Sequence, residues 1–239
     1  IYGLALRSSH NSLDHAPGIM RTGQSGKQSI TWTSKYGSVI ASGWDVGTSD
    51  GMNEKGLVAN MLYLTESVYP KPSSGDKRKT LSISPWAQYF LDNHDTVASA
   101  VADMRKEPFY IVTTSSPDNR DGTFHLSLSD ATGDSAVFEY IDGKLVIHHS
   151  KDYTVMTNSP VFDKQLALNE YREEIGGTAM LPGTNRAADR FVHASYYMNI
   201  VSKTDDVNEA VAIAFSVVRN TSVPIGISTP GQPNISTTL

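Results

Sequence analysis

Residues 123–148 read TFHLSLSDATGDSAVFEYIDGKLVIH, a pattern typical of three consecutive antiparallel strands. Apolar residues occupy positions 124, 126 and 128 and polar residues the positions between them, so the two kinds point to opposite faces of a strand. Asp130-Ala-Thr-Gly133 makes one turn, and Asp142-Gly143 is a two-residue hairpin signal. The stretch therefore predicts a β-meander in the middle of the chain.

Strand-like and helical segments surround this meander. Apolar and β-branched runs at 30–32, 38–42, 57–64 and 109–113 predict further strands. Helices are expected to start at Ser84-Pro85, Asp95 and Ser159-Pro160, and two more are expected at 184–201 and 206–219. Meander sheets with clustered helices predict an α+β fold whose sheet faces are covered by helices. No shift in composition divides the chain, so residues 1–239 are expected to form a single domain.

The composition of the chain limits its partners and its chemistry. The 239 residues carry 20 Lys and Arg against 25 Asp and Glu, and this net charge of −5 argues against nucleic acid as the main partner. No apolar run reaches the roughly 18 residues that a membrane span needs. Cysteine is absent, which excludes disulfides, cysteine-ligated metals and a cysteine nucleophile within these residues.

Most of the titratable residues form no recognisable catalytic or metal-binding motif. His10 and His15 share a polar loop, but the sequence nominates no third ligand, so no metal site is predicted. The serine nucleophile elbow is absent, and the carboxylates of Asp118 and Asp121 lie in a polar segment that does not favour glycosidase chemistry. No cofactor is predicted.

Asn158 and Arg190 are the polar residues that point most directly to a site. Asn158 lies where a strand gives way to a helix, a junction that exposes an amide and backbone N–H groups as an oxyanion site. Arg190 lies on a helix with an apolar face, where a guanidinium has to find an anion or a carbonyl. Two structural explanations stay open at this point: Asn158 as the cap of a helix, and Arg190 as a member of an ion pair.

Four motifs resemble the choloylglycine hydrolase family, which contains penicillin V acylases and bile salt hydrolases. They read WTSKYGSVIAS (32–42), DGMNEKGL (50–57), VMTNSP (155–160) and LPGTNRAADRF (181–191). The resemblance covers nearly the whole chain and is strongest to the Gram-negative penicillin V acylase branch. It implies an N-terminal-nucleophile hydrolase with an αββα sandwich, incomplete at both ends in these residues.

The resemblance also implies a mechanism and a set of site residues. In this family an N-terminal cysteine attacks a linear amide, its own α-amino group acts as the base, and an oxyanion hole stabilises the tetrahedral intermediate. Asn158 matches the family's active-site asparagine, Arg190 the arginine of an Arg-Phe pair, Tyr63 an oxyanion-site position, and Arg7 the arginine of the Arg-x-x-Asp-Trp motif. Trp44 and Tyr63 are expected to supply an apolar wall for the acyl group.

The sequence departs from the family pattern near its start. His10 and Asn11 occupy the positions of the family's aspartate and tryptophan, which leaves Asp14 as a displaced candidate for that aspartate. The nucleophilic cysteine is not in the chain, and both ends of the chain are strand-like. We therefore expect these residues to be an internal fragment of a longer polypeptide or a decayed copy of a family member. By themselves they are not expected to hydrolyse an amide.

Competing functions follow from the resemblance and from this departure. The first is a linear amide hydrolase that removes the acyl group of penicillin V, an acyl-homoserine lactone or a bile salt conjugate. The second is a homologue without a nucleophile that binds acylated amides and does not turn them over. A plain α+β interaction domain is a third and weaker reading. The resemblance further implies export to the periplasm and assembly into a homotetramer.

Overall fold

The computed structural model describes residues 18–23, 28–43, 47–71, 73, 75–113 and 121–222, with the side chain of Thr178 left out. The described residues divide into two compact units, a larger one within residues 18–153 and a smaller one within residues 154–222. The larger unit contains the predicted meander, and the smaller unit contains the helices that follow it in the sequence.

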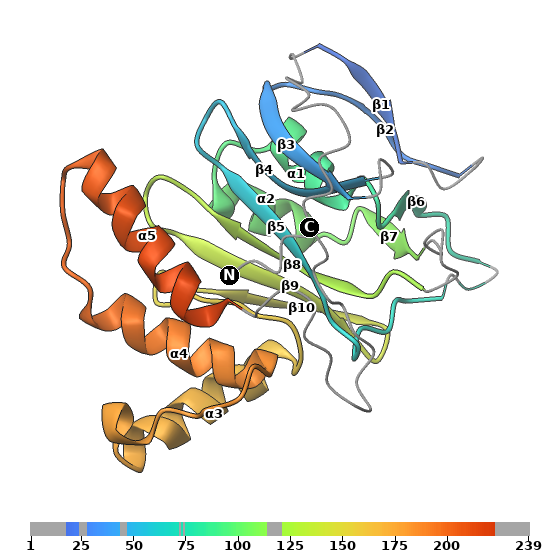
Figure 1. Ribbon diagram of the computed structural model, residues 1–239. Helices are drawn as coiled ribbons and strands as arrows, with labels where there is room; N and C mark the ends of the chain where they lie inside the picture. The colour runs from blue at the N-terminus through green and yellow to red at the C-terminus, as the bar shows by residue number, and fades with distance from the viewer. Residues whose placement is uncertain are drawn as a thin grey trace. The chain divides into compact units, whose positions relative to one another are not determined.

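A six-stranded antiparallel sheet forms the centre of the larger unit, in the order β10-β9-β8-β5-β4-β3 (Figure 1). Its strands are β3 (Ser38–Gly43), β4 (Gly47–Asn53), β5 (Val58–Tyr63), β8 (Phe124–Ser129), β9 (Ser135–Ile141) and β10 (Lys144–His149). The meander prediction is confirmed, because β8 pairs with β9 and β9 pairs with β10. Asp142 and Gly143 have φ angles of 51° and 77°, as a type I′ hairpin turn requires.

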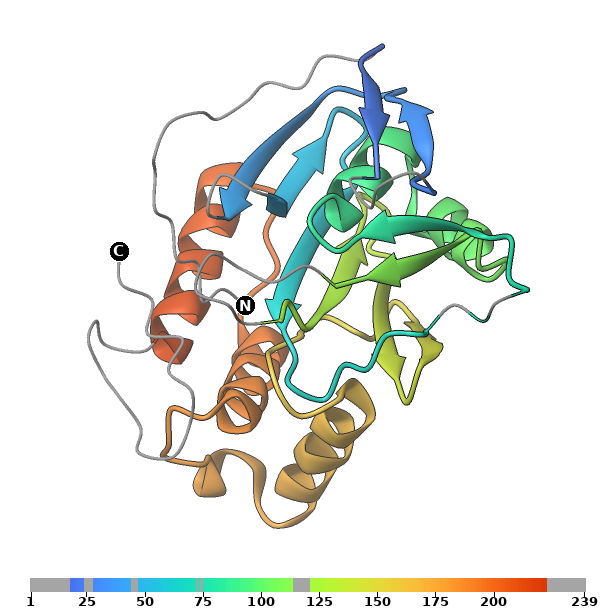
Figure 2. The same cartoon turned by 90° about the vertical axis from the view of Figure 1, so that its right-hand side faces the viewer.

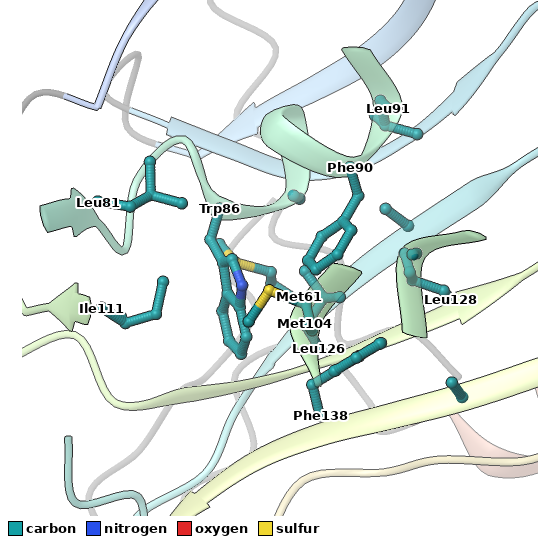
Figure 3. Close-up of a cluster of buried hydrophobic side chains, with 14 of the residues drawn as sticks. Met61, Leu81, Trp86, Phe90, Leu91, Met104, Ile111, Leu126, Leu128 and Phe138 are labelled. Carbon is teal, nitrogen blue, oxygen red and sulfur yellow. The ribbon is translucent and has the colours of Figure 1, made fainter. Parts of the chain in front are cut away.

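Helices α1 (Trp86–Asn93) and α2 (Val97–Met104) cover one face of this sheet, where the alternating apolar residues of the strands need a partner. Figure 3 shows Trp86 and Phe90 of α1 and Met104 of α2 against Leu126 and Phe138 of the sheet. The rings of Phe90 and Phe138 stack with their centroids 5.3 Å apart. All five side chains are excluded from solvent, so this core holds the two helices against the sheet.

The starts of the helices differ from the sequence prediction by one or two residues. The N-cap of α1 is Pro85 rather than Ser84. The N-cap of α2 is Thr96 rather than Asp95, and its hydroxyl accepts a hydrogen bond from the backbone N–H three residues later. Thr96 is preferred because a capping oxygen has to reach the second or third N–H of the helix, and the helix begins one residue later than expected.

Two short strand pairs complete the described part of the larger unit (Figure 2). β1 (Met20–Thr22) pairs antiparallel with β2 (Thr31–Thr33), and β6 (Lys79–Ser82) pairs parallel with β7 (Phe109–Val112). The buried carboxylate of Asp92 in α1 anchors the first pair. Arg21 of β1 lies 2.6 Å from it in an ion pair, and Trp32 of β2 donates a hydrogen bond of 2.8 Å to it.

The regular secondary structure in the described part of the smaller unit is helical (Figure 1). The elements are α3 (Phe162–Glu174), the 3-10 turn η1 (Gly177–Met180), α4 (Ala187–Ile200) and α5 (Val207–Thr221). α4 packs against both α3 and α5, and Phe162 meets Phe191 edge to face with centroids 6.1 Å apart. In the described ranges, no helix is both long and apolar enough to cross a bilayer. The packing of α3 on α4 brings the loop before α3 close to the first turn of α4.

Candidate active site

Asn158 lies in the loop that leads into α3. The sequence predicted that Ser159-Pro160 starts this helix, but α3 begins at Phe162, with Val161 as its N-cap and no side-chain cap. The explanation of Asn158 as a helix cap is therefore wrong. Its side-chain oxygen instead accepts a hydrogen bond from α4.

Arg190 provides that hydrogen bond from the first turn of α4, next to the buried ring of Phe191. Its Nη2 donates to Oδ1 of Asn158 over 3.2 Å. Within the part of the chain that the structure describes, Arg190 forms no ion pair, and its buried Nε has no hydrogen-bond partner. The ion-pair explanation thus finds no support among these residues. A guanidinium with so few partners is costly to bury, so its position calls for a functional reason.

The surroundings of Arg190 disfavour its positive charge. Burial lowers the pKa of the Arg190 guanidinium below its ordinary value, because removal from water penalises the charged form. The first turn of a helix carries partial positive charge, which repels a cation. Negative charge that develops next to Arg190 would relieve both costs. The arrangement is therefore suited to stabilising an oxyanion.

The hydrogen bond from Arg190 also fixes the carboxamide of Asn158. A carboxamide has one acceptor oxygen and one donor nitrogen, so accepting through Oδ1 sets the direction in which its N–H groups point. Arg190 and Asn158 together form a polar pair, one charged and one neutral, in which each side chain orients the other. We call this hydrogen-bonded set the Asn158–Arg190 pair.

Gln165 of α3 holds the loop that carries Asn158. The sequence did not point to Gln165 as a site residue. Its side chain is fully buried. Its Nε2 donates to the backbone carbonyls of Asn158 and Pro160 over 2.6 Å each, and its Oε1 accepts from the backbone N–H of Thr157 over 3.1 Å. A single polar residue in a helix that mixes polar and apolar residues gives no signal until the fold shows what it faces.

Tyr63 belongs to the larger unit, whereas the Asn158–Arg190 pair belongs to the smaller one. It is the last residue of β5 and half-buried, and its ring meets Phe124 of β8 edge to face with centroids 6.0 Å apart. The structure thus brings together Asn158 and Arg190 among the predicted site residues and fixes Tyr63 at the end of a central strand. The remaining predicted residues lie outside the described residues: Arg7, Asp14 and Trp44.

A buried cluster of histidine and glutamate lies on the sheet of the larger unit. His125 Nδ1 is 2.9 Å from Oε1 of Glu139, and His148 Nε2 is 3.4 Å from Oε2 of the same carboxylate. His148 is nearly buried and His149 is exposed, because neighbouring residues on a strand point to opposite faces. No group of three or more side chains that could hold a metal ion occurs within the described ranges. The sequence did not indicate this cluster, because its three residues are brought together by the pairing of β8, β9 and β10.

Comparisons with known proteins assign the chain to a family. Residues 20–239 match the sequence model of a family described as linear amide C-N hydrolases, choloylglycine hydrolase family. The chain belongs to this family. The family resemblance seen in the four motifs is thereby confirmed.

Individual relatives in the choloylglycine hydrolase family support the assignment. The chain is 53% identical over 238 residues to a penicillin V acylase of Pectobacterium atrosepticum. The alignment covers 92% of this chain and 63% of that protein. The structure of penicillin V acylase from Agrobacterium tumefaciens matches with a TM-score of 0.84 and 57% identity over 95% of this chain and 72% of that one. The chain therefore spans less than two thirds of the length of the Pectobacterium acylase.

A more distant structure extends the likeness. A variant of the conjugated bile acid hydrolase from Clostridium perfringens matches with a TM-score of 0.70 and 25% identity, over 90% of this chain and 71% of that one. The predicted α+β fold of the N-terminal-nucleophile hydrolases is confirmed by these two structural matches together with the large antiparallel sheet and its helices.

Proposed function

We propose that the protein to which these residues belong is a linear amide hydrolase that removes the acyl side chain of penicillin V. The observation that carries the proposal is the 53% identity to a penicillin V acylase over 92% of the chain. The Asn158–Arg190 pair supports it, because a partly buried guanidinium beside a neutral amide is suited to an oxyanion.

The proposed reaction needs a nucleophile from outside these residues, because the 239 residues contain no cysteine. In the family mechanism the thiol of an N-terminal cysteine attacks the amide carbon, and the α-amino group takes the thiol proton and passes it to the leaving nitrogen. Water then hydrolyses the thioester. The carbonyl oxygen becomes an oxyanion during the first step and needs fixed donors around it.

The residues of this chain are proposed to serve that oxyanion and the acyl group. Asn158 would donate to the oxyanion through its amide nitrogen, and Tyr63 is proposed as an oxyanion-site residue from the family resemblance alone. Arg190 would hold the Asn158 carboxamide and add positive charge. Arg7 is proposed as a further catalytic residue. Two roles complete the proposal: Asp14 as the group that binds the cysteine's amino group, and Trp44 with Tyr63 as the apolar wall for the phenoxyacetyl group.

Turnover by the full-length protein tests the proposal. The protein is expressed from its gene, its mature N-terminus is sequenced, and the release of phenoxyacetic acid from penicillin V is followed by chromatography. We expect an N-terminal cysteine and steady release of the acid. A variant in which this cysteine is replaced by alanine should release no acid. A mature chain that has the cysteine and releases no acid from penicillin V, an acyl-homoserine lactone or a glycine-conjugated bile salt would contradict the proposal.

The altered segment at residues 7–11, where His10 and Asn11 occupy the positions of the family's aspartate and tryptophan, favours one second candidate, a homologue that binds acylated amides and does not cleave them. Equilibrium binding separates the two functions. A full-length protein without an N-terminal cysteine that binds penicillin V and releases no product supports the second candidate.

Localisation and assembly are proposed from the family as well. We infer export to the periplasm and a homotetramer, for which cell fractionation and light scattering on the full-length protein are the direct measurements. Recovery in the cytoplasmic fraction, or a monomer at micromolar concentration, would contradict these two expectations.

A further inference from the structure

We propose that Gln165 is the positioning residue of the candidate active site: its buried carboxamide holds the loop 157–160 so that Asn158 meets Arg190. The inference rests on the proposed amide hydrolase function and assigns that function a residue that the four sequence motifs did not point to. Gln165 would act through Asn158 and would not touch the substrate.

The carboxamide of Gln165 is saturated by this loop. Its Nε2 has two protons, and the carbonyl oxygens of Asn158 and Pro160, each 2.6 Å away, take both. Its Oε1 accepts from the backbone N–H of Thr157 over 3.1 Å. Because the side chain has no exposed surface, water does not compete for these bonds. One side chain thus fixes the backbone before, at and after Asn158.

The side chain and the backbone of Asn158 have different partners. Gln165 binds only the backbone of Asn158, whereas the Asn158 side chain accepts the hydrogen bond from Arg190 over 3.2 Å. A loop whose backbone is held from inside can present a side chain with little conformational freedom. Preorganisation of this kind is what a donor to a developing oxyanion requires.

Thr157 connects the same loop to the helix that carries Arg190. Its hydroxyl donates to the backbone carbonyl of Ala187 over 2.8 Å, and Ala187 is the first residue of α4. The hydroxyl also lies 3.2 Å from Oε1 of Gln165, but its one proton goes to the closer carbonyl. Thr157 and Gln165 therefore connect both partners of the Asn158–Arg190 pair. Gln165 holds the loop that carries Asn158, and Thr157 binds the first residue of the helix that carries Arg190.

The chemistry of the site explains why glutamine is suited to this role. Leucine has a similar volume, but it would leave the carbonyls of Asn158 and Pro160 buried without donors. Glutamate would place a carboxylate against those carbonyl oxygens and would lose both donors. Either change should shift the loop while the helices keep their packing.

The test measures kcat and KM for penicillin V in the full-length Gln165→Leu variant. We expect kcat to fall about 10- to 100-fold, because misplacing a reacting group by about 1 Å costs that much, while KM stays within about threefold. Asn169→Leu is the matched control, since it removes a carboxamide one turn later on α3 whose hydrogen bond goes to Glu173 at the surface. This control should keep the wild-type kcat.

A second control separates positioning from loss of stability. Phe162→Leu weakens the packing of α3 on α4 and leaves the Gln165 carboxamide in place. We expect it to lower the melting temperature with little change in kcat. If Phe162→Leu and Gln165→Leu lower kcat equally at equal loss of melting temperature, the inference is overturned.

Thr157 gives a conservative pair of variants for the case in which Gln165→Leu does not fold. Thr157→Val removes the hydroxyl that binds Ala187, and Thr157→Ser restores it. We expect kcat to fall about tenfold in Thr157→Val and to return to within about twofold of wild type in Thr157→Ser. Equal kcat values in the two variants would contradict the coupling between loop and helix.

Failure of the proposed function is distinguishable from failure of this inference. An inactive wild-type protein contradicts the proposed function alone, and the inference is then judged from a crystal structure of Gln165→Leu. Separation of Asn158 Oδ1 from Arg190 Nη2 beyond hydrogen-bonding distance supports the positioning role. Retention of that bond in the variant overturns it.

Discussion

Two charged side chains, the buried Asp92 in the larger unit and the partly buried Arg190 in the smaller one, have opposite surroundings. The carboxylate of Asp92 has no exposed surface and is matched on both oxygens: Arg21 and Trp32 approach Oδ2, and Gln88 donates to Oδ1 over 2.8 Å. Arg190 donates one hydrogen bond to a neutral amide, and among the residues that the structure describes its buried Nε has no partner. Within these residues, the charge of Asp92 is compensated and that of Arg190 is not.

The difference separates a structural charge from a functional one. A buried ion that is paired and hydrogen-bonded holds elements together, and Asp92 does so for β1, β2 and α1. A buried ion without compensation weakens a fold, so it persists where its field is needed for binding or chemistry. Removing Asp92 should therefore change stability, and removing Arg190 should change activity.

The largest effect is expected for Arg190→Met in the full-length protein. Methionine keeps much of the length and volume and removes the charge, so kcat/KM for penicillin V should fall about 1000-fold, the upper range for the loss of one oxyanion-stabilising group. The free energy of unfolding should stay the same or rise, because a poorly compensated buried charge is removed. Steady-state kinetics and urea unfolding of one preparation check both values. A loss of stability of several kcal/mol with unchanged kcat/KM would show that Arg190 is a structural charge and contradict its assignment as a functional one.

Asp92→Asn should show the opposite behaviour. It leaves Arg21 without its carboxylate, and breaking a buried ion pair in this way costs about 3 kcal/mol of unfolding free energy. Activity per folded molecule, measured well below the melting temperature, should stay within about threefold of wild type. The control is Asp95→Asn, an exposed carboxylate near the start of α2, whose unfolding curve should match that of the wild type. A stable but inactive Asp92→Asn variant would contradict the structural role.

Trp32→Phe sharpens the comparison with a smaller step. Phenylalanine keeps an aromatic ring near Tyr89, which meets Trp32 edge to face at 5.4 Å, and removes the N–H that binds Asp92. Because Arg21 and Gln88 still compensate the carboxylate, we expect a loss of about 1.5 kcal/mol. A double variant with Asp92→Asn should lose less than the sum of the two single losses, since the second change removes a bond already broken. Additive losses would show that the hydrogen bond does not contribute.

The smallest expected effect is a pH dependence at Asp103, whose carboxylate is only partly buried. The pKa of Asp103 lies below its ordinary value of 3.8, because the His94 imidazole and the Tyr89 hydroxyl bind the carboxylate. A lowered folded-state pKa adds stability above 3.8 that is lost as the pH falls through the folded-state pKa. Asp103→Asn should lose under about 1 kcal/mol at neutral pH, with the deficit shrinking below about pH 4.

Tyr89→Phe is the matched variant for this pH dependence, since it removes one of the two partners of Asp103. It should show a smaller loss of stability with the same pH dependence. Thermal unfolding at several pH values measures this loss. A deficit in Asp103→Asn that is constant from neutral to acidic pH would contradict the assignment.

The sequence predicted what depends on local periodicity and missed what depends on cross-chain contacts. The strands and turns from Phe124 to His148 follow from alternation and from Asp142-Gly143, and the structure confirms them. The caps of α1, α2 and α3 were misplaced by one or two residues, because several polar residues or prolines in a row compete for one position. Strand β4 (Gly47–Asn53) was not predicted, because its residues are too polar and glycine-rich for a strand pattern.

The residues of the candidate site also differ in whether local sequence or contacts between distant segments reveal them. Asn158 and Arg190 were predicted from their motifs, but only the fold shows that they share a hydrogen bond. Gln165 and Asp92 carry no sequence signal, because the role of a buried polar side chain depends on groups that packing brings to it. Such residues can be predicted once the pairing of helices and strands is known.

A double-mutant cycle on kcat/KM tests the central claim most directly, namely that Asn158 and Arg190 act as one unit. The full-length wild type, Asn158→Ala, Arg190→Met and the double variant are compared with penicillin V as substrate. If the pair works through the 3.2 Å hydrogen bond, the double variant should be scarcely worse than the more damaged single variant, with a coupling of more than about 1 kcal/mol. Losses that add within about 0.3 kcal/mol would contradict the claim and make the two residues independent.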